Sequence, residues 1–154
     1  MNNGKHNIGD FFEGGIIAYI DNSTGHGLIA SEKDLDLQYC WYNGSNLKVK
    51  TKDGIGFGKT NTDTIIELQG EGIYAAKACK DLTLNGFNDW FLPNKEELHQ
   101  LYLNKNIIGG FVGDCYWSSS EFYNFSGLSQ DFSNGFQEGT FKEKKIYVRA
   151  VRTF

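Results

Sequence analysis

The chain has 154 residues, 40% hydrophobic and 22% charged, which is the composition of a folded domain rather than a disordered segment. Its formal net charge is −4 and no run of Lys or Arg exceeds two residues, which argues against binding to nucleic acid. The sequence shows no signal peptide and no apolar run that would insert into a membrane. We therefore expect one domain over residues 1–154.

Glycine and aromatic residues are abundant, whereas proline occurs only once. This balance favours tight turns and short strands over a helical bundle. The three cysteines are Cys40, Cys79 and Cys115, and an odd number argues against a complete set of disulfides. Free and mostly buried thiols are the favoured interpretation, with one disulfide as the alternative.

The N-terminal region predicts a β-hairpin. Residues 14–20 and 26–30 are apolar segments on either side of turn residues 21–25. Residues 31–60 show no regular period, and their glycines are typical of turns.

A helical pattern follows, and either Thr62 or Asp63 is suited to cap its beginning. Gly70 and Gly72 are expected to break or kink this region. The Asn85-Gly86 pair is expected to end it.

A second helix is predicted directly after Pro93. Asn94 is suited to the N-cap and Glu97 to the third helical position, which together form a capping-box pattern. Leu98, Leu101 and Tyr102 then recur at helical spacing and predict one buried face. The remaining chain predicts four short strands, at about residues 115–119, 128–133, 136–142 and 146–152.

Seven short motifs occur in order along almost the whole chain. They are Ile8-Gly9-Asp10 with Gly14-Gly15-Ile16-Ile17, then residues 26–30, 55–62, 74–77, 89–93, 116–121 and 148–152. In this order they resemble a bacterial and phage family, named after the C-terminal domain of the Legionella collagen-like adhesin.

The resemblance implies an α+β fold of C-type lectin-like type, with two helices packed on small antiparallel sheets and both termini close together. It also implies binding of glycans or cell-surface proteins. Similar domains are the variable proteins of diversity-generating retroelements, and their hypervariable segment corresponds to about residues 118–145 here. The adhesin relatives suggest sulfated glycans, but the acidic charge balance counts against a polyanion. Lys142, Lys144 and Lys145 form the one local basic cluster.

Two catalytic interpretations are disfavoured. Residues 53–60 resemble a phosphate-binding loop, but Asp53 stands where that pattern requires glycine and no apolar strand precedes it. A glycine turn leading into a helix is favoured instead. Cys115 with His99 or His26 would make a nucleophile and base, whereas a buried cysteine is the commoner state next to an aromatic strand. We expect no enzyme and no cofactor.

Metal binding is also disfavoured. The three histidines lack zinc-ligand spacing with each other or with the cysteines. Glu121, Asp131 and Glu138 are the residues that would assemble a cation site if one exists. Trp90 is interpreted as a core residue and Asp89 as a turn residue, rather than as a calcium motif.

Alternation along the strand around Trp117 predicts that Ser119 and Glu121 point to the same side as this buried ring. Both polar side chains in that position need partners, and Arg149 or Arg152 are the candidates. We expect this pair to have a structural role that fixes the strand register.

Residues 121–137 are dominated by Tyr, Phe, Asn, Ser and Gly, a composition that resembles antibody binding surfaces. Rigid aromatic rings supply contact area and small polar residues supply hydrogen bonds. The alternative is that Phe122, Phe132 and Phe136 pack inward as core residues. The predicted ligand-binding residues are Tyr123, Asn124, Phe125, Gln130, Phe132, Asn134 and Phe136.

We therefore predict a non-enzymatic receptor-binding or adhesion domain on a cell surface, secreted or on a virion. Its partner would be a cell-surface glycan or protein, and a homo-oligomer is compatible with the sequence. One rival is a structural or oligomerisation module of a phage tail or surface fibre, which predicts these aromatics buried between subunits. The other is an enzyme with a cleft around Cys115 or the carboxylates.

Overall fold

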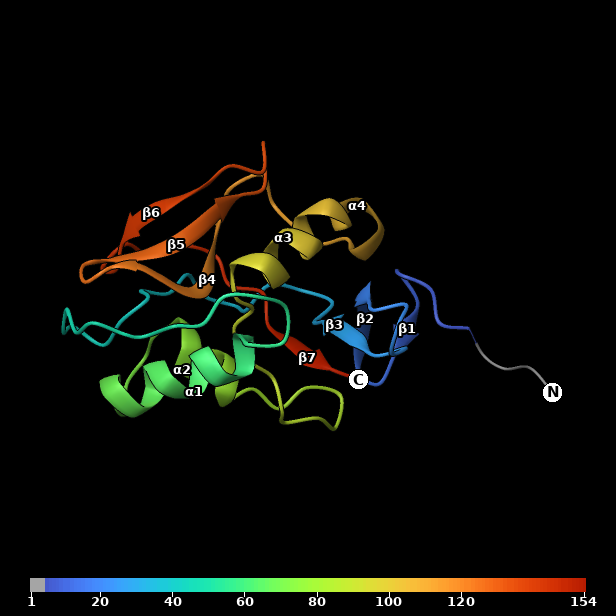
Figure 1. The fold of residues 1–154 in the computed structure, drawn as a ribbon, viewed down its shortest axis with the longest axis horizontal. Coiled ribbons are helices and arrows are strands. Elements are labelled where there is room, and N and C mark those ends of the chain that lie inside the picture. The colour runs from blue at the N-terminus through green and yellow to red at the C-terminus, as the bar shows by residue number, and fades with distance from the viewer. Residues whose placement is uncertain (1–4) are drawn as a thin grey trace.

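The computed structural model describes residues 5–154, which form two small antiparallel sheets and four helices (Figure 1). The first sheet has the strand order β1-β2-β3-β7, with bounds Phe11–Phe12, Gly15–Ile20, Gly27–Ala30 and Val151–Thr153. The second has the order β4-β5-β6, with bounds Cys115–Tyr123, Ser126–Asp131 and Gln137–Phe141. The α+β class is confirmed, and the C-type lectin-like arrangement stays an implication of the resemblance.

The expected two helices are observed as two longer helices, each followed by a short one. Their bounds are Gly58–Gln69 for α1, Ala75–Lys80 for α2, Lys95–Leu103 for α3 and Lys105–Ile108 for α4. Helices α1 and α2 lie together below the three-stranded sheet in Figure 1, whereas α3 lies between the two sheets. Because α3 contacts β2 on one side and β4 and β5 on the other, it joins the sheets into one body.

The predicted N-terminal hairpin is confirmed, with Ile17 opposite Ile29 in the β2–β3 pair. The C-terminal strand β7 then pairs with β3, placing Arg152 opposite Ile29. The rings of His6 and Phe154 lie 5.8 Å apart. The described beginning and end of the chain therefore meet at one sheet, as the resemblance implied.

Helix α1 begins earlier than predicted. Its first residue is Gly58 and its N-cap is Phe57, which provides no side-chain hydrogen bond, so neither Thr62 nor Asp63 caps it. The Thr62 hydroxyl is buried inside the helix, where it donates to the carbonyl of Gly58 and accepts from the amide of Leu92. The threonine thus joins the helix to the segment before α3 instead of beginning a helix.

The predicted break after α1 is confirmed, since the C-cap Gly70 has φ 73° and the chain resumes as a separate helix α2. The predicted end at Asn85-Gly86 is wrong, because α2 ends at Lys80. Asn85 and Gly86 have φ angles of 51° and 82°, the conformation of a tight hairpin turn. They connect the isolated bridge between Leu84 and Phe87.

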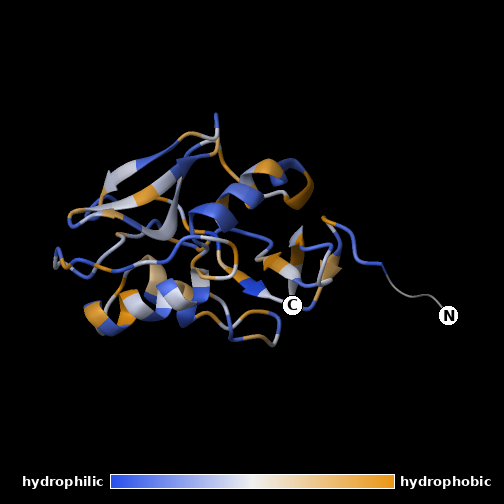
Figure 2. Cartoon of the chain, in the orientation of Figure 1, coloured by the Kyte–Doolittle hydropathy of each residue, from blue (hydrophilic) through white to orange (hydrophobic). Residues whose placement is uncertain are grey.

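The capping box that begins α3 is confirmed. The Asn94 side chain accepts from the amide of Glu97 (3.0 Å), and the Glu97 carboxylate accepts from the amide of Asn94 (2.8 Å). Leu98 and Leu101 are fully buried and Tyr102 is half-buried, which confirms the predicted apolar face. Figure 2 shows the corresponding mixture of hydrophobic and hydrophilic residues along the helices.

The core contains three fully buried tryptophans, Trp41, Trp90 and Trp117, of which the last two were predicted. The last predicted strand, residues 146–152, is mostly irregular. Ile146 and Tyr147 form only isolated bridges, and regular pairing begins at Val151. This segment crosses between the two sheets and contributes to both.

Candidate functional site

Four aromatic side chains are exposed together at the β4–β5 turn. We call Phe122, Tyr123, Phe125 and Phe141 the aromatic cluster; their exposed fractions are 49%, 61%, 51% and 61%. Neighbouring ring centroids lie 4.7 Å (Phe122–Tyr123), 6.4 Å (Tyr123–Phe125) and 6.1 Å (Phe125–Phe141) apart. A contiguous apolar surface of this kind is typical of a site where a partner binds.

The path of β4 explains this exposure. Its central residues, from Tyr116 to Ser120, are all buried, because α3 and the loops cover both faces of the strand there. The strand then runs past the core, and Tyr123 pairs with Ser126, leaving Asn124 and Phe125 as a two-residue turn. The side chains of Phe122, Tyr123, Asn124 and Phe125 are therefore exposed at the edge of the core.

A glycine in β6, two strands away from β4, accommodates Phe122. A Cβ atom on Gly139 would overlap the Phe122 ring, so the absence of a side chain lets this ring cover β6. Leu128 lies opposite Gly139 in the β5–β6 register and is only half-buried. The Phe122 ring thus lies over the sheet near its turn end.

A buried lysine holds the turn from below. The side chain of Lys142 has no exposed surface, and its Nζ donates to the carbonyl oxygens of Asn124 (2.6 Å) and Leu47 (3.0 Å). The same nitrogen donates to Glu121 Oε2 (2.9 Å) and lies 4.6 Å from the Trp41 ring centroid. All of these groups stabilise the buried positive charge.

Glu121 therefore pairs with Lys142, and the prediction that it pairs with Arg149 or Arg152 is wrong. The expected partner for Ser119 is also not observed, since its buried hydroxyl makes no hydrogen bond among the described residues. Glu121 Oε2 also accepts from the amide of Val49 (2.7 Å), which attaches the preceding loop to β4. The two arginines have other partners because the C-terminal segment carries them past β4 toward the first sheet.

Lys142 holds the turn through the main chain of the turn, and we call this arrangement the clamp. Lys142 binds the Asn124 carbonyl with its side chain and donates its own amide to the Phe125 carbonyl (3.0 Å). Both turn carbonyls are thereby held while the side chains of Asn124 and Phe125 point to solvent. The turn is rigid in its backbone and free at its surface, which is the arrangement of a preorganised binding loop.

The structure divides the predicted ligand-binding residues into two groups. Tyr123, Asn124 and Phe125 are exposed at the β4–β5 turn, whereas Asn134 and Phe136 are exposed at the β5–β6 turn. The length of β5 separates the two turns by roughly 17–20 Å. Within one copy these residues do not form one surface.

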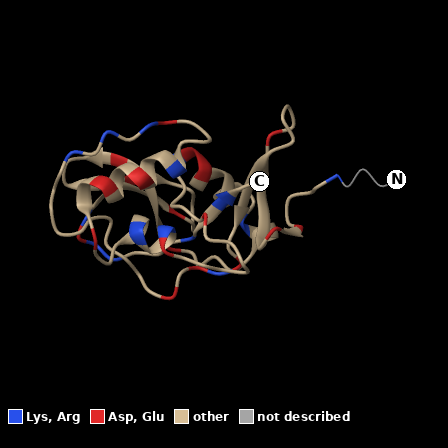
Figure 3. Ribbon diagram, turned by 90° about the horizontal axis from the view of Figure 1, so that it is seen from below, with Lys and Arg blue, Asp and Glu red and all other residues tan. Residues whose placement is uncertain are grey.

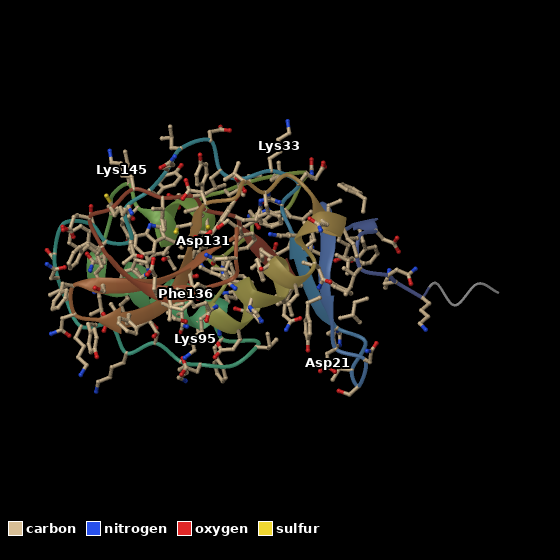
Figure 4. The ribbon with its side chains drawn as sticks, turned by 90° about the horizontal axis from the view of Figure 1, so that it is seen from above. Asp21, Lys33, Lys95, Asp131, Phe136 and Lys145 are labelled. Carbon is tan, nitrogen blue, oxygen red and sulfur yellow. The ribbon has the colours of Figure 1, made fainter. Side chains whose placement is uncertain are left out.

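The second turn adjoins α3. Figure 4 labels Phe136 at this end of the sheet together with Asp131 and Lys95. The Gln137 side chain donates to the carbonyl of Lys95 (2.8 Å), and a cavity of about 300 Å³ lies between Gln137 and the α3 residues Lys95 and His99.

Two predicted residues are buried, so the expectation that Gln130 is a surface residue is wrong. Gln130 Nε2 lies 2.9 Å from His99 Nδ1 and donates to the carbonyl of Gly135 (3.0 Å), so it connects the sheet to α3. Phe132 is 1% exposed, and its ring centroid lies 4.5 Å from that of Tyr116. Burial leaves neither side chain available to a ligand.

Conversely, the sequence prediction omitted two members of the aromatic cluster, Phe122 and Phe141. Phe122 was weighed as an inward-facing residue. The signal that would have indicated exposure is Gly139, because a glycine in the middle of a strand often marks a place where another group approaches closely.

Asp89 is more than a turn residue. Arg152 donates to both of its oxygens, from Nε (2.7 Å) and Nη2 (3.0 Å), and also stacks on the Phe87 ring. The hydrogen bonds from Arg152 lower the pKa of Asp89. This pair attaches the end of β7 to the segment that leads into Trp90.

The cysteines are free thiols, as favoured from the sequence. Burial raises the pKa of Cys79, and burial together with the nearby Asp131 raises the pKa of Cys115. An activated nucleophile requires the opposite shift. The carboxyl of Glu97 has its pKa raised to about 7 by burial, but it caps α3 and accepts from the amide of Gly56. Non-enzymatic function stays a prediction that these directions favour.

Two of the three carboxylates that were weighed as a cation site have other partners, and Glu138 is exposed on β6. Glu121 binds Lys142, and Asp131 accepts from the amide and hydroxyl of Ser133. Within residues 5–154, no three His, Cys, Asp or Glu side chains are placed to hold a metal ion.

The predicted basic cluster contains only two exposed residues, Lys144 and Lys145, because Lys142 is buried. Figure 3 shows acidic and basic residues interspersed on the face it presents.

The fold and site together define an α+β domain that displays an exposed aromatic turn on a rigid frame. Residues 32–152 match the Lcl C-terminal domain family, so the chain belongs to this family and is an adhesin-like surface domain. No curated protein matches the chain. Among the helices of residues 5–154, none has both the length and the apolar character needed to cross a bilayer.

Proposed function

We propose that this domain binds ligands without catalysis, as a receptor-binding or adhesion module, and that the β4–β5 turn is its contact surface. The observation that carries the proposal is the aromatic cluster, exposed on a turn whose main chain is held by the buried Lys142. Ordering a flexible loop on binding costs free energy, and a turn that is already held avoids this cost.

The chemistry of the turn suits a glycan or a protein on a cell surface. The rings of Tyr123 and Phe125 supply flat apolar contact area, and the Asn124 side chain supplies a donor and an acceptor between them. The net charge of −4 and the burial of Lys142 make a strongly anionic ligand a poor match. The proposed location is a cell surface, a secreted protein or a virion.

The same geometry supports the proposal that this is a variable protein of a diversity-generating retroelement. Lys142 holds the turn through the carbonyls of Asn124 and Phe125, so replacing these two side chains leaves the clamp intact. Different residues displayed there would give different ligand specificities on one frame.

The experiment is binding of the purified domain to arrays of glycans and target-cell surface proteins, with calcium and with EDTA. The test variant is Tyr123→Ala/Phe125→Ala. The matched control is Leu68→Ala/Ile73→Ala, which removes two exposed apolar side chains from the α1–α2 region. All three proteins should melt at similar temperatures, because every substituted side chain is exposed.

Specific binding that the test variant loses and the control keeps would support the turn as the contact surface. Binding that survives in the test variant would refute that location. If no protein binds any target, the ligand-binding proposal fails and the rival, a structural module of a phage tail or surface fibre, gains support.

A further inference from the structure

The strand β6 forms an open edge of the second sheet. Its register against β5 runs without a shift from Ser126 opposite Phe141 to Gln130 opposite Gln137. The amide of Lys142 donates to the carbonyl of Phe125. In an antiparallel pair, alternate residues direct their main-chain groups to the same neighbour, so those of Glu138 and Thr140 also point toward β5.

The main-chain groups of the alternate residues Gln137, Gly139 and Phe141 therefore point away from the sheet. Among residues 5–154, the one main-chain bond to these groups is from the amide of Lys144 to the carbonyl of Phe141 (3.0 Å). The outward amides and the carbonyls of Gln137 and Gly139 are free to pair. Figure 1 shows β6 as the outermost strand of its sheet.

The other edges are protected, and on the outer side of β7 Val151 exchanges two main-chain hydrogen bonds with Phe91. The strand β1 has only two residues. On the outer side of β4, the amide of Trp117 donates to the carbonyl of Tyr147 (3.0 Å) and that of Ser119 to the carbonyl of Pro93 (2.8 Å). Proteins usually protect a long edge with proline, a bulge or several charges, and β6 has none of these except Glu138.

We propose that β6 pairs antiparallel with β6 of a second copy of this chain, about a two-fold axis through Gly139. Gly139 then lies opposite Gly139 of the second copy, and Gln137 lies opposite its Phe141. The two glycines exchange two main-chain hydrogen bonds. At each flanking pair, the amide of Phe141 of one copy donates to the carbonyl of Gln137 of the other, which adds one hydrogen bond per pair. The two three-stranded sheets become one continuous six-stranded sheet.

The side chains next to this edge are self-complementary. The ring of Phe122 occupies the space above Gly139, so the Phe122 rings of the two copies meet over the glycine pair. Opposed Cα atoms in such a pair lie about 5.5 Å apart, which brings the rings into contact. Phe122 and Phe141, now 49% and 61% exposed, lose much of their contact with water. A foreign strand would provide no matching glycine and ring.

Pairing also reunites the divided ligand-binding residues. Because Phe141 of one copy lies opposite Gln137 of the other, the β4–β5 turn of the first adjoins the β5–β6 turn of the second. Tyr123 and Phe125 then lie beside Asn134 and Phe136 of the second copy, which gives two equivalent composite surfaces per dimer. The pairing stands without a ligand, whereas the composite surface rests on the proposed function.

One residue opposes the pairing. Glu138 and Glu138 of the second copy are diagonal neighbours on the other face of the new ladder, about 7–8 Å apart. Their repulsion keeps the association reversible. The Glu138→Gln variant should therefore have a lower dimer dissociation constant than the native chain.

The test is sedimentation equilibrium of the purified domain from low micromolar to millimolar concentration. We expect a monomer–dimer equilibrium. Phe122→Glu and Phe122→Lys should each raise the dimer dissociation constant by about tenfold or more, because like charges meet across the axis. An equimolar mixture of the two variants should recover a heterodimer. Ile73→Glu, a charge change at an exposed site of α1–α2, should dimerise normally.

A domain that stays monomeric at millimolar concentration overturns the proposal. So does a dimer that resists both Phe122 substitutions, or variants that do not recover on mixing. A monomeric Phe122→Glu variant that keeps its full affinity for the array ligand overturns the composite surface alone. Loss of ligand binding in Tyr123→Ala/Phe125→Ala with an intact dimer supports both proposals.

Discussion

Replacing Lys142 by methionine tests how the frame holds the β4–β5 turn. Methionine retains most of the side-chain volume but removes the ammonium group. Three acceptors lose their donor: the carboxylate of Glu121 and the carbonyls of Asn124 and Leu47. The Glu121 side chain is 7% exposed and would keep only the amide of Val49 as a partner.

The expected cost is large because an unpaired charge stays buried. Removing one partner of a buried ion pair costs about 3–5 kcal/mol of unfolding free energy. For a chain of this length each kcal/mol lowers the melting temperature by roughly 2–4 °C, so we expect a decrease of about 6–20 °C. Lys142→Met/Glu121→Gln should recover part of the loss, since a neutral amide oxygen still accepts from Val49.

The assay is urea unfolding followed by tryptophan fluorescence, which reports on the buried Trp41 under the lysine. The double-mutant cycle between Lys142 and Glu121 should give a coupling energy above about 1 kcal/mol. A Lys142→Met variant that loses less than about 1 kcal/mol would show that the pair behaves as an exposed one. The buried clamp would then be refuted.

Two further predictions concern the frame. Burial raises the pKa of Glu97 to about 7, above its unfolded value of about 4.5. Between these two pKa values the folded state binds a proton at Glu97 that the unfolded state does not. Protonation of Glu97 therefore stabilises the fold fully below pH 4.5, and this stabilisation is lost as the pH rises through about 7. In urea titrations the unfolding free energy of the native chain should fall by roughly 3 kcal/mol between pH 4.5 and 8, and Glu97→Gln should remove this decrease. An equal decrease in both proteins would show that Glu97 is not its cause. Gly127→Ala should lower the free energy of unfolding by about 1–3 kcal/mol in the same assay, because its Cβ would lie 2.5 Å from Cδ1 of the buried Trp41. Gly113→Ala controls for the loss of a glycine, because its Cβ would make only an ordinary contact with Ser133 Cβ at 3.7 Å.

The elements that could be predicted from the sequence are those set by neighbouring residues. The β2–β3 hairpin follows from two apolar segments around a turn, and the start of α3 follows from the Asn94–Glu97 capping box. Helix α1 was misplaced because its first residue, Gly58, is a poor helix former. Contacts of Gly58 with Phe91 and Glu97 place it at the beginning of a helix, and these partners are remote in the sequence.

Ion-pair partners were beyond the reach of a local pattern. Arg149 pairs with Asp34, 115 positions earlier, and Lys142 pairs with Glu121 across the second sheet. The sequence indicated that Glu121 needs a cationic partner, but it did not indicate which of Lys142, Arg149 and Arg152 lies next to it.

The candidate site was predicted in part for a related reason. Composition located the exposed turn at Tyr123–Phe125, whereas the burial of Gln130 depends on α3 covering β5. No residue near Gln130 in the sequence carries that information.

The C-terminal segment explains why this small fold retains buried charges that apolar side chains of similar size often replace without loss in other proteins. Each of its three buried cations, Lys142, Arg149 and Arg152, donates to a carboxylate and also to main-chain carbonyls of irregular segments. These carbonyls belong to Leu47, Asn124, Ser31, Gly109 and Glu13. Buried main-chain groups outside helices and sheets require a partner, and an apolar replacement would leave them without one. The cations therefore order the loops, and the ordered loops in turn hold the display turn in place.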